Sequence, residues 1–251
     1  MSLPGKPLLS SQQPSSFFTT KPLYLQVRDA LLERITNNEW KSGLSIPSEA
    51  DLAREMGVSL GTMRKAFDVL AKEQVVTRRQ GRGTFVNSQT SDAYSLRYSN
   101  IRGPNGERLI GDVKSSKVTK SAANEMECER LSLQKEDKVY RIQRVRLTDG
   151  TPFMLEEVSV PEWLFPGLEK RVSIPNCVGN LAQEYSIVLG TAAERISVAS
   201  VSQDVAQTLM VAPGSPVAVL DRVVQAIDSR PVEWRMAWCN LAKNYYLACI
   251  A

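Results

Sequence analysis

Residues 48–86 read SEADLAREMGVSLGTMRKAFDVLAKEQVVTRRQGRGTFV and decide the fold of the N-terminal part of the chain. Two short amphipathic patterns flank a central Gly-Val-Ser, and a glycine-punctuated, arginine-rich stretch follows them. Gly57 suits the left-handed backbone position that ends many helices. Ser48 and Ser59 each stand where a side chain can cap the start of a helix. The stretch therefore predicts two helices joined by a tight turn, with a β-hairpin after them.

The second of these predicted helices has one apolar face and one polar face. The apolar residues recur at the spacing of an amphipathic helix, at Met63, Ala66, Phe67 and Leu70. The outward side carries Thr62, Arg64 and Lys65 near the start of the helix. Short hydrogen-bond donors and cations at a helix N-terminus suit the major groove of DNA. A helix-turn-helix that reads DNA is therefore the favoured interpretation, and a structural helical hairpin with a solvated charged face is the alternative.

The arginine-rich stretch predicts a β-wing. Val75-Val76-Thr77 and Thr84-Phe85-Val86 are rich in strand-forming residues, and Gly81-Arg82-Gly83 is a turn pattern between them. Three arginines concentrate charge at the expected tip, where phosphates or a minor groove can be reached: Arg78, Arg79 and Arg82. A phosphate cradle for a nucleotide is disfavoured, because a strand and not a helix follows the glycines.

Several segments between residues 21 and 87 resemble the winged-helix domain of the GntR family of bacterial transcription regulators. They are PLYLQV (22–27), IPSEADLA (46–53), GVS (57–59), TMRKA (62–66) and QGRGTFV (80–86). The resemblance implies that the second and third helices and the wing hold DNA. The positions that match the family's DNA contacts are Ser48, Glu49, Thr62, Arg64 and Gly81.

Two positions depart from the family pattern. Ala50 and Leu60 stand where the family usually has arginines that contact DNA. The resemblance therefore implies an atypical operator or a larger contribution from the wing. With the residues derived from the pattern itself, the predicted DNA-binding set is Ser48, Glu49, Ser59, Thr62, Arg64, Lys65, Arg78, Arg79, Gly81 and Arg82.

The charge distribution agrees with one nucleic-acid face on an otherwise neutral protein. The chain of 251 residues has a formal net charge of +4. Between Thr62 and Val86 there are six cations and two acids, and six minus two is +4, so this segment accounts for the whole net charge. A local basic surface of this kind favours nucleic acid as a partner.

The composition excludes several kinds of site. The chain contains no histidine, which removes His-based triads, His general bases and the usual zinc ligands. Its four cysteines, Cys128, Cys177, Cys239 and Cys249, show no CxxC spacing, so we expect buried thiols in a reducing cytoplasm, with neither a metal nor a cofactor. A redox sensor is an alternative without positive support. No apolar run reaches the length of a membrane span, and no signal peptide is visible.

Composition also suggests the domain boundaries. Residues 1–20 are rich in Ser, Pro and Gln and predict a disordered tail. We expect a DNA-binding domain at 21–87 that begins with a helix at Pro22, a polar linker at 88–100, and a second domain at 101–251. The second domain shows strand-like runs with turn signals between them, and its helix candidates are 124–133, 180–189 and 204–210.

An internal similarity links residues 139–152 and 217–231. Both are strand patterns with an Arg-Val pair (Arg144-Val145 and Arg222-Val223), and both continue into an Asp-led turn and a proline. A carboxylate-bearing strand follows each, with Glu156 or Glu157 in the first unit and Glu233 in the second. This favours one antiparallel sheet built from a duplicated unit, and a chance match of strand-rich sequence is the alternative.

Arg144 and Arg146 lie two residues apart on the first of these strands, so their side chains share a face. The same face carries the apolar Tyr140 and Ile142. Two guanidinium groups on such a face indicate contact with an anion or with carboxylates. Solvated arginines on a half-exposed sheet are the alternative.

The C-terminal part resembles the UTRA effector domain of the HutC subfamily of GntR regulators, which has a chorismate-lyase-like fold. The matching segments are KVYRIQRVRLTDGTP (138–152), LEEVSVP (155–161), LFPGL (164–168), GSPV (214–217), DRVV (221–224) and RPVEW (230–234). The resemblance covers roughly residues 101–251. It implies that Arg144, Arg146, Glu156 and Glu233 line a ligand pocket.

This second resemblance also has departures. Residues 237–242 read AWCNLA where many relatives have a tyrosine followed by an Arg-Gly-Asp-like run. The serine that often opens the pocket helix is replaced near Asn176. Both departures speak against a sugar-phosphate effector of the commonest kind.

Together these features predict an α+β protein with an N-terminal winged helix-turn-helix and a C-terminal antiparallel sheet flanked by helices. The predicted function is a sequence-specific DNA-binding transcription regulator, a repressor, controlled by a small anionic or zwitterionic metabolite. The family resemblance implies a homodimer. Two alternatives stay open: a lyase-like enzyme domain fused to a DNA-binding head, and a constitutive architectural DNA binder. The lack of histidine and of a nucleophile-base pair argues against the enzyme.

Overall fold

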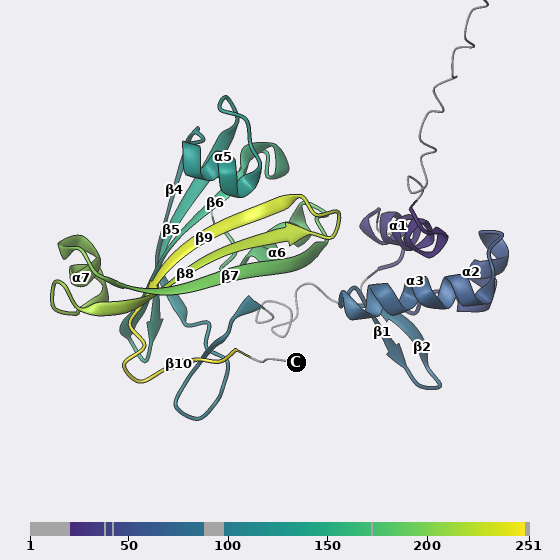
Figure 1. Ribbon diagram of the computed structural model, residues 1–251, viewed down its shortest axis with the longest axis horizontal. Helices are drawn as coiled ribbons and strands as arrows, with labels where there is room; N and C mark the ends of the chain where they lie inside the picture. Colours follow the sequence, from purple (N-terminus) through teal and green to yellow (C-terminus); the bar gives the residue numbers. More distant parts are fainter. Residues whose placement is uncertain (1–20, 38, 42, 88–97, 172, 249–251) are drawn as a thin grey trace, which may run out of the picture.

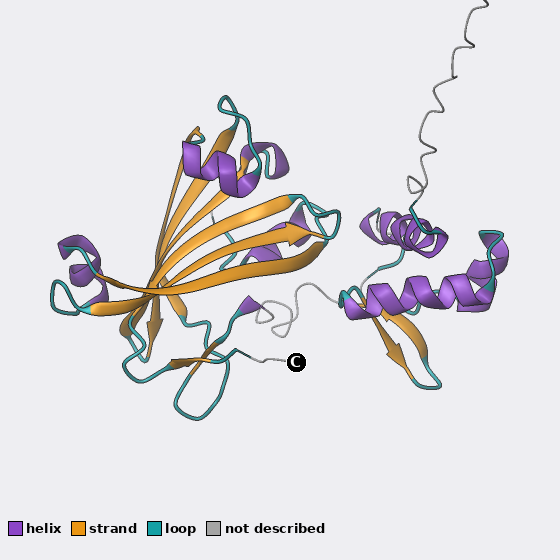
Figure 2. Ribbon diagram, in the orientation of Figure 1, coloured by secondary structure: helices purple, strands orange, loops and turns teal. Residues whose placement is uncertain are grey.

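A computed structural model describes residues 21–37, 39–41, 43–87, 98–171 and 173–248. It has the α+β architecture that the sequence predicts, with a small helical head and a large antiparallel sheet (Figure 1, Figure 2). The predicted tail at 1–20 and most of the predicted linker lie outside the described residues.

The head consists of three helices and a two-stranded hairpin. The elements are α1 (Leu23–Thr36), α2 (Glu49–Glu55), α3 (Leu60–Lys72), β1 (Val76–Arg79) and β2 (Gly83–Val86). The strands β1 and β2 pair antiparallel, so the predicted helix-turn-helix and wing are both present. The hairpin projects from the end of α3 in Figure 1.

The head is held by the apolar faces that the helical periodicity predicts. Met63, Ala66, Phe67 and Leu70 are all fully buried, and they pack in one cluster with Val27, Leu31 and Ile35 of α1. Full burial of an aliphatic or aromatic side chain contributes about 1.5–3 kcal/mol. The turn is also formed as predicted, since Gly57 has a φ of 64° and Ser59 Oγ accepts a hydrogen bond from the Thr62 amide at 3.1 Å.

The C-terminal part is built on one six-stranded antiparallel sheet with the order β4-β5-β6-β9-β8-β7. Its strands are β4 (Asp112–Ala122), β5 (Lys138–Thr148), β6 (Thr151–Pro161), β7 (Leu189–Ser200), β8 (Pro216–Ala226) and β9 (Pro231–Cys239). A short pair, β3 (Ile101–Arg102) and β10 (Tyr245–Tyr246), lies beside it. The topology brings the second half of the domain directly against the first, through β6 and β9.

Helices cover the two faces of this sheet. α5 (Glu125–Leu131) and α7 (Gln203–Leu209) lie on one face, where they pack on residues such as Trp234 and Leu155. α6 (Val178–Glu184) packs on the other face against Ile142, Val158 and Val224. We call this second face the inner face. Two short 3-10 turns, Glu162–Leu164 and Leu168–Lys170, join β6 to α6.

The predicted helix at 180–189 has the wrong bounds. α6 begins two residues earlier, at Val178, and ends at Glu184. Ser186 then adopts a left-handed φ of 56°, which a helix cannot continue through, and Leu189 already begins β7. The other two predicted helices form as α5, which is shorter than expected, and α7, which has the expected length but begins one residue earlier.

The sheet order supports the predicted duplication. β4, α5, β5 and β6 follow one another in the same order as β7, α7, β8 and β9. The two units meet with β6 beside β9, so equivalent strands lie on either side of the centre of the sheet. The arginine and glutamate side chains of the two units therefore meet at the centre of the sheet.

Candidate functional site

The exposed surface of α3 and the wing carries the predicted DNA-binding residues. The Arg64 side chain is 64% exposed, and Lys65, Arg79 and Arg82 are also exposed. Gly81 lies in the turn of the wing with a φ of 70°, a conformation that glycine adopts without strain. The structure therefore offers several unburied cations to a polyanionic partner.

An ion-pair network joins the helices to the wing. Arg78 of β1 contacts the carboxylate of Glu49 at 2.8 Å and that of Asp68, and Arg64 lies 3.6 Å from Glu49. The prediction that Arg78 lies at the tip of the wing is therefore wrong, because these carboxylates on α2 and α3 hold it within β1. Exposed pairs of this kind contribute about 0–1 kcal/mol, so a DNA phosphate can compete for the same guanidinium groups.

The remaining predicted residues lie around this network. The hydroxyls of Ser48 and Ser59 are used as helix caps, and Thr62 is half-exposed at the start of α3. The Lys65 ammonium lies 5.8 Å from the ring centroid of Tyr24 on α1, and the Arg79 guanidinium lies 4.8 Å from that of Phe85. These aromatic contacts orient two exposed cations without burying them.

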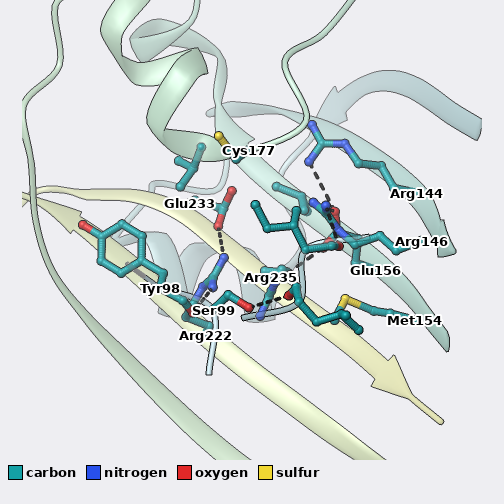
Figure 3. A pocket seen from close by; sticks show the side chains of 14 residues that line it. Tyr98, Ser99, Arg144, Arg146, Met154, Glu156, Cys177, Arg222, Glu233 and Arg235 are labelled. Carbon is teal, nitrogen blue, oxygen red and sulfur yellow. Dashed lines mark hydrogen bonds and ion pairs between the residues drawn. The ribbon is translucent and has the colours of Figure 1, made fainter. Parts of the chain in front are cut away.

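A small cavity lies on the inner face of the large sheet (Figure 3). Its volume is about 40 Å³, so anything larger than a few water molecules can enter only when the lining side chains move apart. Four arginines from β5, β8 and β9 surround it together with two glutamates, and the lining also includes Tyr98, Ser99 and Cys177. The polar residues that define it are Arg144, Arg146, Glu156, Arg222, Glu233 and Arg235.

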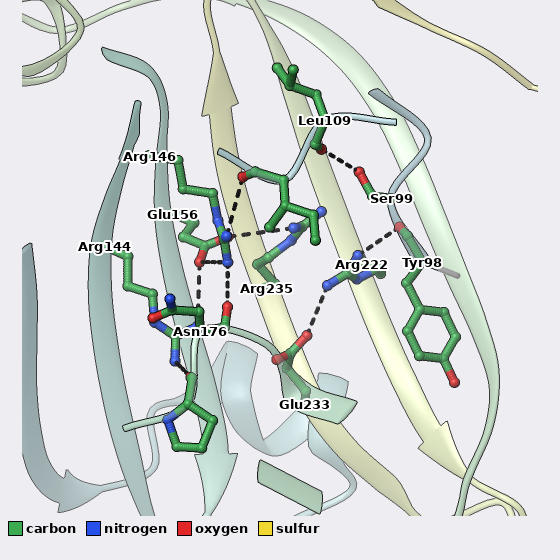
Figure 4. A network of polar contacts seen from close by, with 12 residues as sticks. Tyr98, Ser99, Leu109, Arg144, Arg146, Glu156, Asn176, Arg222, Glu233 and Arg235 are labelled. Atoms are coloured by element: carbon green, nitrogen blue, oxygen red, sulfur yellow. Dashed lines mark hydrogen bonds and ion pairs between the residues drawn. The ribbon is translucent and has the colours of Figure 1, made fainter. Parts of the chain in front are cut away.

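Glu156 is the centre of the first part of this cluster (Figure 4). Its Oε1 accepts hydrogen bonds from Arg146 at 2.7 Å and from Arg144 at 3.4 Å, and its Oε2 accepts one from Arg235 at 3.5 Å. Burial would raise the pKa of Glu156, but the positive charges of Arg146, Arg235 and Arg144 outweigh it and lower the pKa to about 2. The carboxylate therefore stays ionised at neutral pH.

The second part of the cluster contains the remaining carboxylates. Arg222 Nη2 donates to Glu233 Oε1 at 3.1 Å, and Arg235 Nη2 donates to Glu194 Oε1, also at 3.1 Å. Burial and the nearby charge of Arg235 lower the pKa of Arg222. Four guanidinium groups thus face three carboxylates (Glu156, Glu194 and Glu233), so the set carries a net charge of +1 although every arginine in it has an ion-pair partner.

Main-chain carbonyls supply most of the other acceptors. Arg144 donates to the Pro175 carbonyl at 2.9 Å, and Arg222 donates to the Tyr98 carbonyl at the same distance. Arg146 donates to the carbonyls of Asn176 at 2.6 Å and Ile110 at 3.2 Å. The Nε atoms of three of the arginines are buried without an acceptor among the described residues: Arg144, Arg222 and Arg235. The arginines that line the cavity therefore have unused hydrogen-bond donors, and the cluster has an excess of positive charge.

The structure brings together all four residues that the sequence predicted for the pocket: Arg144, Arg146, Glu156 and Glu233. It also resolves the choice between Glu156 and Glu157, since Glu157 is exposed and bonds to Gln143. Two further arginines that line the pocket, Arg222 and Arg235, were not predicted from the sequence. The duplicated Arg-Val pair was a signal for Arg222, and the spacing of two residues from Glu233 was a signal for Arg235.

Near Asn176, the residue that opens α6 is Cys177, which lines the cavity but makes no capping hydrogen bond. The expectation of uniformly buried cysteines is wrong for Cys128 and Cys177, which are half-buried. Cys239 is buried, and burial raises the pKa of its thiol to about 12. Cys249 lies outside the described residues.

Neither a metal-binding cluster nor a membrane-spanning helix is found in the described part of the chain. It contains no group of three or more cysteine, aspartate or glutamate residues arranged to hold a metal ion. No helix in that part is long and apolar enough to cross a membrane.

Comparison with known proteins assigns both parts of the chain. A family model described as "Bacterial regulatory proteins, gntR family" matches residues 23–86, and one described as "UTRA domain" matches residues 112–243. The mannosyl-D-glycerate transport/metabolism system repressor MngR of Escherichia coli (strain K12) is 26% identical over 218 residues, covering 85% of this chain and 90% of that protein.

Another relative and a solved structure agree with this assignment. The probable fructoselysine utilization operon transcriptional repressor of Escherichia coli (strain K12) is 26% identical and covers 87% of this chain and 90% of its own length. The crystal structure of PhnF from Mycobacterium smegmatis has the same fold, with a TM-score of 0.52 and 21% identity over 90% of this chain and 99% of that one. The chain belongs to the GntR family of bacterial regulatory proteins with a C-terminal UTRA domain, and it is a DNA-binding transcription regulator controlled by a small molecule and not an enzyme.

Proposed function

We propose that the protein is a repressor whose head binds a pseudo-palindromic operator and whose sheet cavity binds a small anionic metabolite. The metabolite changes operator affinity because it binds one arrangement of the chain better than the other. The observation that carries the proposal is the buried cluster of four guanidinium groups facing three carboxylates. The relatives named as repressors support the direction of control.

The charge of the cavity defines the effector class. A ligand with one net negative charge would neutralise the excess guanidinium and satisfy donors that have no other acceptor. Two relatives are named for sugar conjugates, mannosyl-D-glycerate and fructoselysine. We therefore propose a polar, sugar-derived or similar metabolite that carries a negative or zwitterionic group.

We propose that the residues predicted from the sequence contact the DNA. Arg64 and Thr62 on α3 enter the major groove, and the arginines of the wing contact phosphates or the minor groove. The head extends over residues 21–87 and the effector domain over 101–251, with a linker at 88–100. A regulator that acts on bacterial DNA works in the cytoplasm.

Replacing Arg144 by alanine tests the effector pocket. Loss of one hydrogen bond from a charged donor should weaken effector binding by about tenfold or more, while operator affinity stays unchanged. The measurement is calorimetry with a metabolite found by a thermal-shift screen of the wild type. Arg141→Ala is the matched control, because Arg141 lies on the same strand but binds Glu127. Equal effector binding by wild type and Arg144→Ala would remove the pocket assignment.

We also propose a homodimer, and the edge strand β7 supports it. Among the described residues β7 pairs only with β8, so its other edge has no partner strand. Two apolar side chains of β7 are exposed, Ile196 by 47% and Val198 by 73%. An exposed apolar edge strand is a template for pairing with another chain.

Introducing a charge on this strand tests the dimer. Val198→Glu should shift the protein from a dimer to a monomer in light scattering coupled to size-exclusion chromatography. Met126→Glu is the control, because Met126 is 56% exposed but lies on α5. A Val198→Glu variant that keeps the mass of two chains would exclude β7 as the dimer surface.

A further inference from the structure

Arg222 binds Tyr98, the first described residue of the predicted linker at 88–100, and it also belongs to the effector cavity. Its Nη1 donates to the carbonyl oxygen of Tyr98 at 2.9 Å, across 124 residues of sequence. The Arg222 guanidinium also lies 5.7 Å from the centroid of the Tyr98 ring. The Tyr98 hydroxyl donates to the Gly190 carbonyl at 2.9 Å. Tyr98 is therefore bound to both β8 and β7.

The same guanidinium group belongs to the cavity (Figure 4). Its Nη2 is bound to Glu233, and its Nε is buried without an acceptor in the described part of the chain. A negatively charged acceptor attracts the guanidinium through a full charge–charge interaction, which a neutral carbonyl lacks. An anion that enters the cavity is thus a stronger acceptor for Arg222 than the neutral Tyr98 carbonyl.

We propose that Arg222 couples effector binding to the DNA-binding head, by exchanging the Tyr98 carbonyl for a negatively charged group of the effector. This inference rests on the proposed effector site. This exchange removes one buried hydrogen bond from the Tyr98 carbonyl. The Tyr98 backbone then shifts, while Ser99 and Asn100 keep their hydrogen bonds to Leu109, Arg102 and Tyr246, and this shift changes the position of the head that precedes Tyr98.

The other cavity arginines hold different segments. Arg144 is bound to the Pro175 carbonyl, and Arg146 is bound to the Asn176 and Ile110 carbonyls. Pro175 and Asn176 precede α6, and Ile110 precedes β4. Among the hydrogen bonds of the described cavity arginines, that of Arg222 is the one that reaches the predicted linker, at Tyr98.

Hydrogen exchange on the full chain tests the coupling without a known effector. In Arg222→Gln, we expect peptides that cover residues 98–102 to exchange about tenfold faster or more, because a hydrogen bond from a charged donor is lost. Arg130→Gln is the matched control. Arg130 pairs with Asp221, the residue beside Arg222 on β8, but from α5 on the opposite face. The control should leave residues 98–102 as protected as in the wild type.

The DNA affinity of the same variants is a second readout. The DNA is a sequence that the wild-type protein selects from a random pool. Without any ligand, Arg222→Gln should bind this DNA about 5- to 150-fold more weakly, the usual range of an allosteric coupling, and Arg130→Gln should bind like the wild type. If Arg222→Gln is unfolded by circular dichroism, Tyr98→Ala replaces it. That variant keeps the Arg222–Glu233 pair but loses the ring and hydroxyl contacts, and it should show both effects.

Two outcomes overturn the coupling. One is unchanged exchange at residues 98–102 in the folded variant, and the other is equal acceleration in Arg130→Gln. Faster exchange with unchanged DNA affinity also overturns it, because the segment then moves without affecting the head. Failure of the proposed function looks different, since a wild-type protein that enriches no DNA sequence contradicts the regulator while leaving the exchange result readable.

Discussion

Glu156→Gln is expected to lower the free energy of unfolding by about 3–5 kcal/mol at pH 7, since it breaks a buried charge cluster from one side. The Glu156 carboxylate is 1% exposed and compensates Arg144, Arg146 and Arg235. Glutamine keeps the shape but removes the charge, so three guanidinium groups would stay buried with one carboxylate fewer. Urea unfolding followed by circular dichroism measures the difference.

The same variant should also lose much of its acid sensitivity. The folded pKa of about 2 lies below the ordinary value of 4.5, so the ionised carboxylate stabilises the folded protein fully above about pH 4.5. That contribution disappears as the pH falls from 4.5 through 2, and the wild type should therefore lose stability steeply in this window. The curve for Glu156→Gln should be flatter there.

Glu157→Gln is the matched control for both measurements. Glu157 is the next residue on β6, but it is exposed on the opposite face and bonds only to Gln143 among the described residues. Its replacement should change stability by less than about 0.5 kcal/mol. If Glu156→Gln were as stable as Glu157→Gln, the cluster would not be the buried, charged structure described above.

Arg64→Ala is expected to weaken operator binding by about 1–3 kcal/mol and to relax sequence preference at one position. Arg64 lies on the exposed side of α3 near its start. Its ion pair with Glu49, at 3.6 Å, is exposed and weak, so the guanidinium can leave Glu49 and turn towards a base. Fluorescence polarisation on the selected operator and on random DNA measures both quantities.

The contrast between the two DNAs decides what Arg64 does. Equal losses on operator and random DNA would show that Arg64 contacts only phosphate and carries no sequence information. Arg54→Ala is the control, because Arg54 on α2 is 78% exposed and pairs with Asp51 of its own helix. That change should alter operator affinity by much less than Arg64→Ala.

The head could be predicted closely from the sequence because its signals are local. Met63 and Phe67 repeat at helical spacing, and Gly57 and Ser59 mark one turn within three residues. Arg78 could not be placed in the same way. Its position depends on Glu49 and Asp68, which lie on separate helices and come close only in the folded head.

The pocket shows the same limit. Arg144 and Glu156 belong to one hairpin, so their pairing follows from neighbouring strands. The contact of Arg235 with Glu156 spans 79 residues and depends on β9 lying beside β6. Glu194 joins the cluster only because β7 pairs with β8 at the other side of the sheet. Strand order, which no single segment encodes, decided these contacts.

Control of the DNA-binding head by a bound metabolite is tested most directly by a titration of the operator complex. The titrant is a metabolite that raises the melting temperature of the wild-type protein. Fluorescence polarisation should show operator affinity falling about 5- to 150-fold as the metabolite saturates the protein. Operator affinity that stays constant at saturation, for every metabolite that stabilises the chain, would contradict control of the DNA-binding head by the arginine cavity.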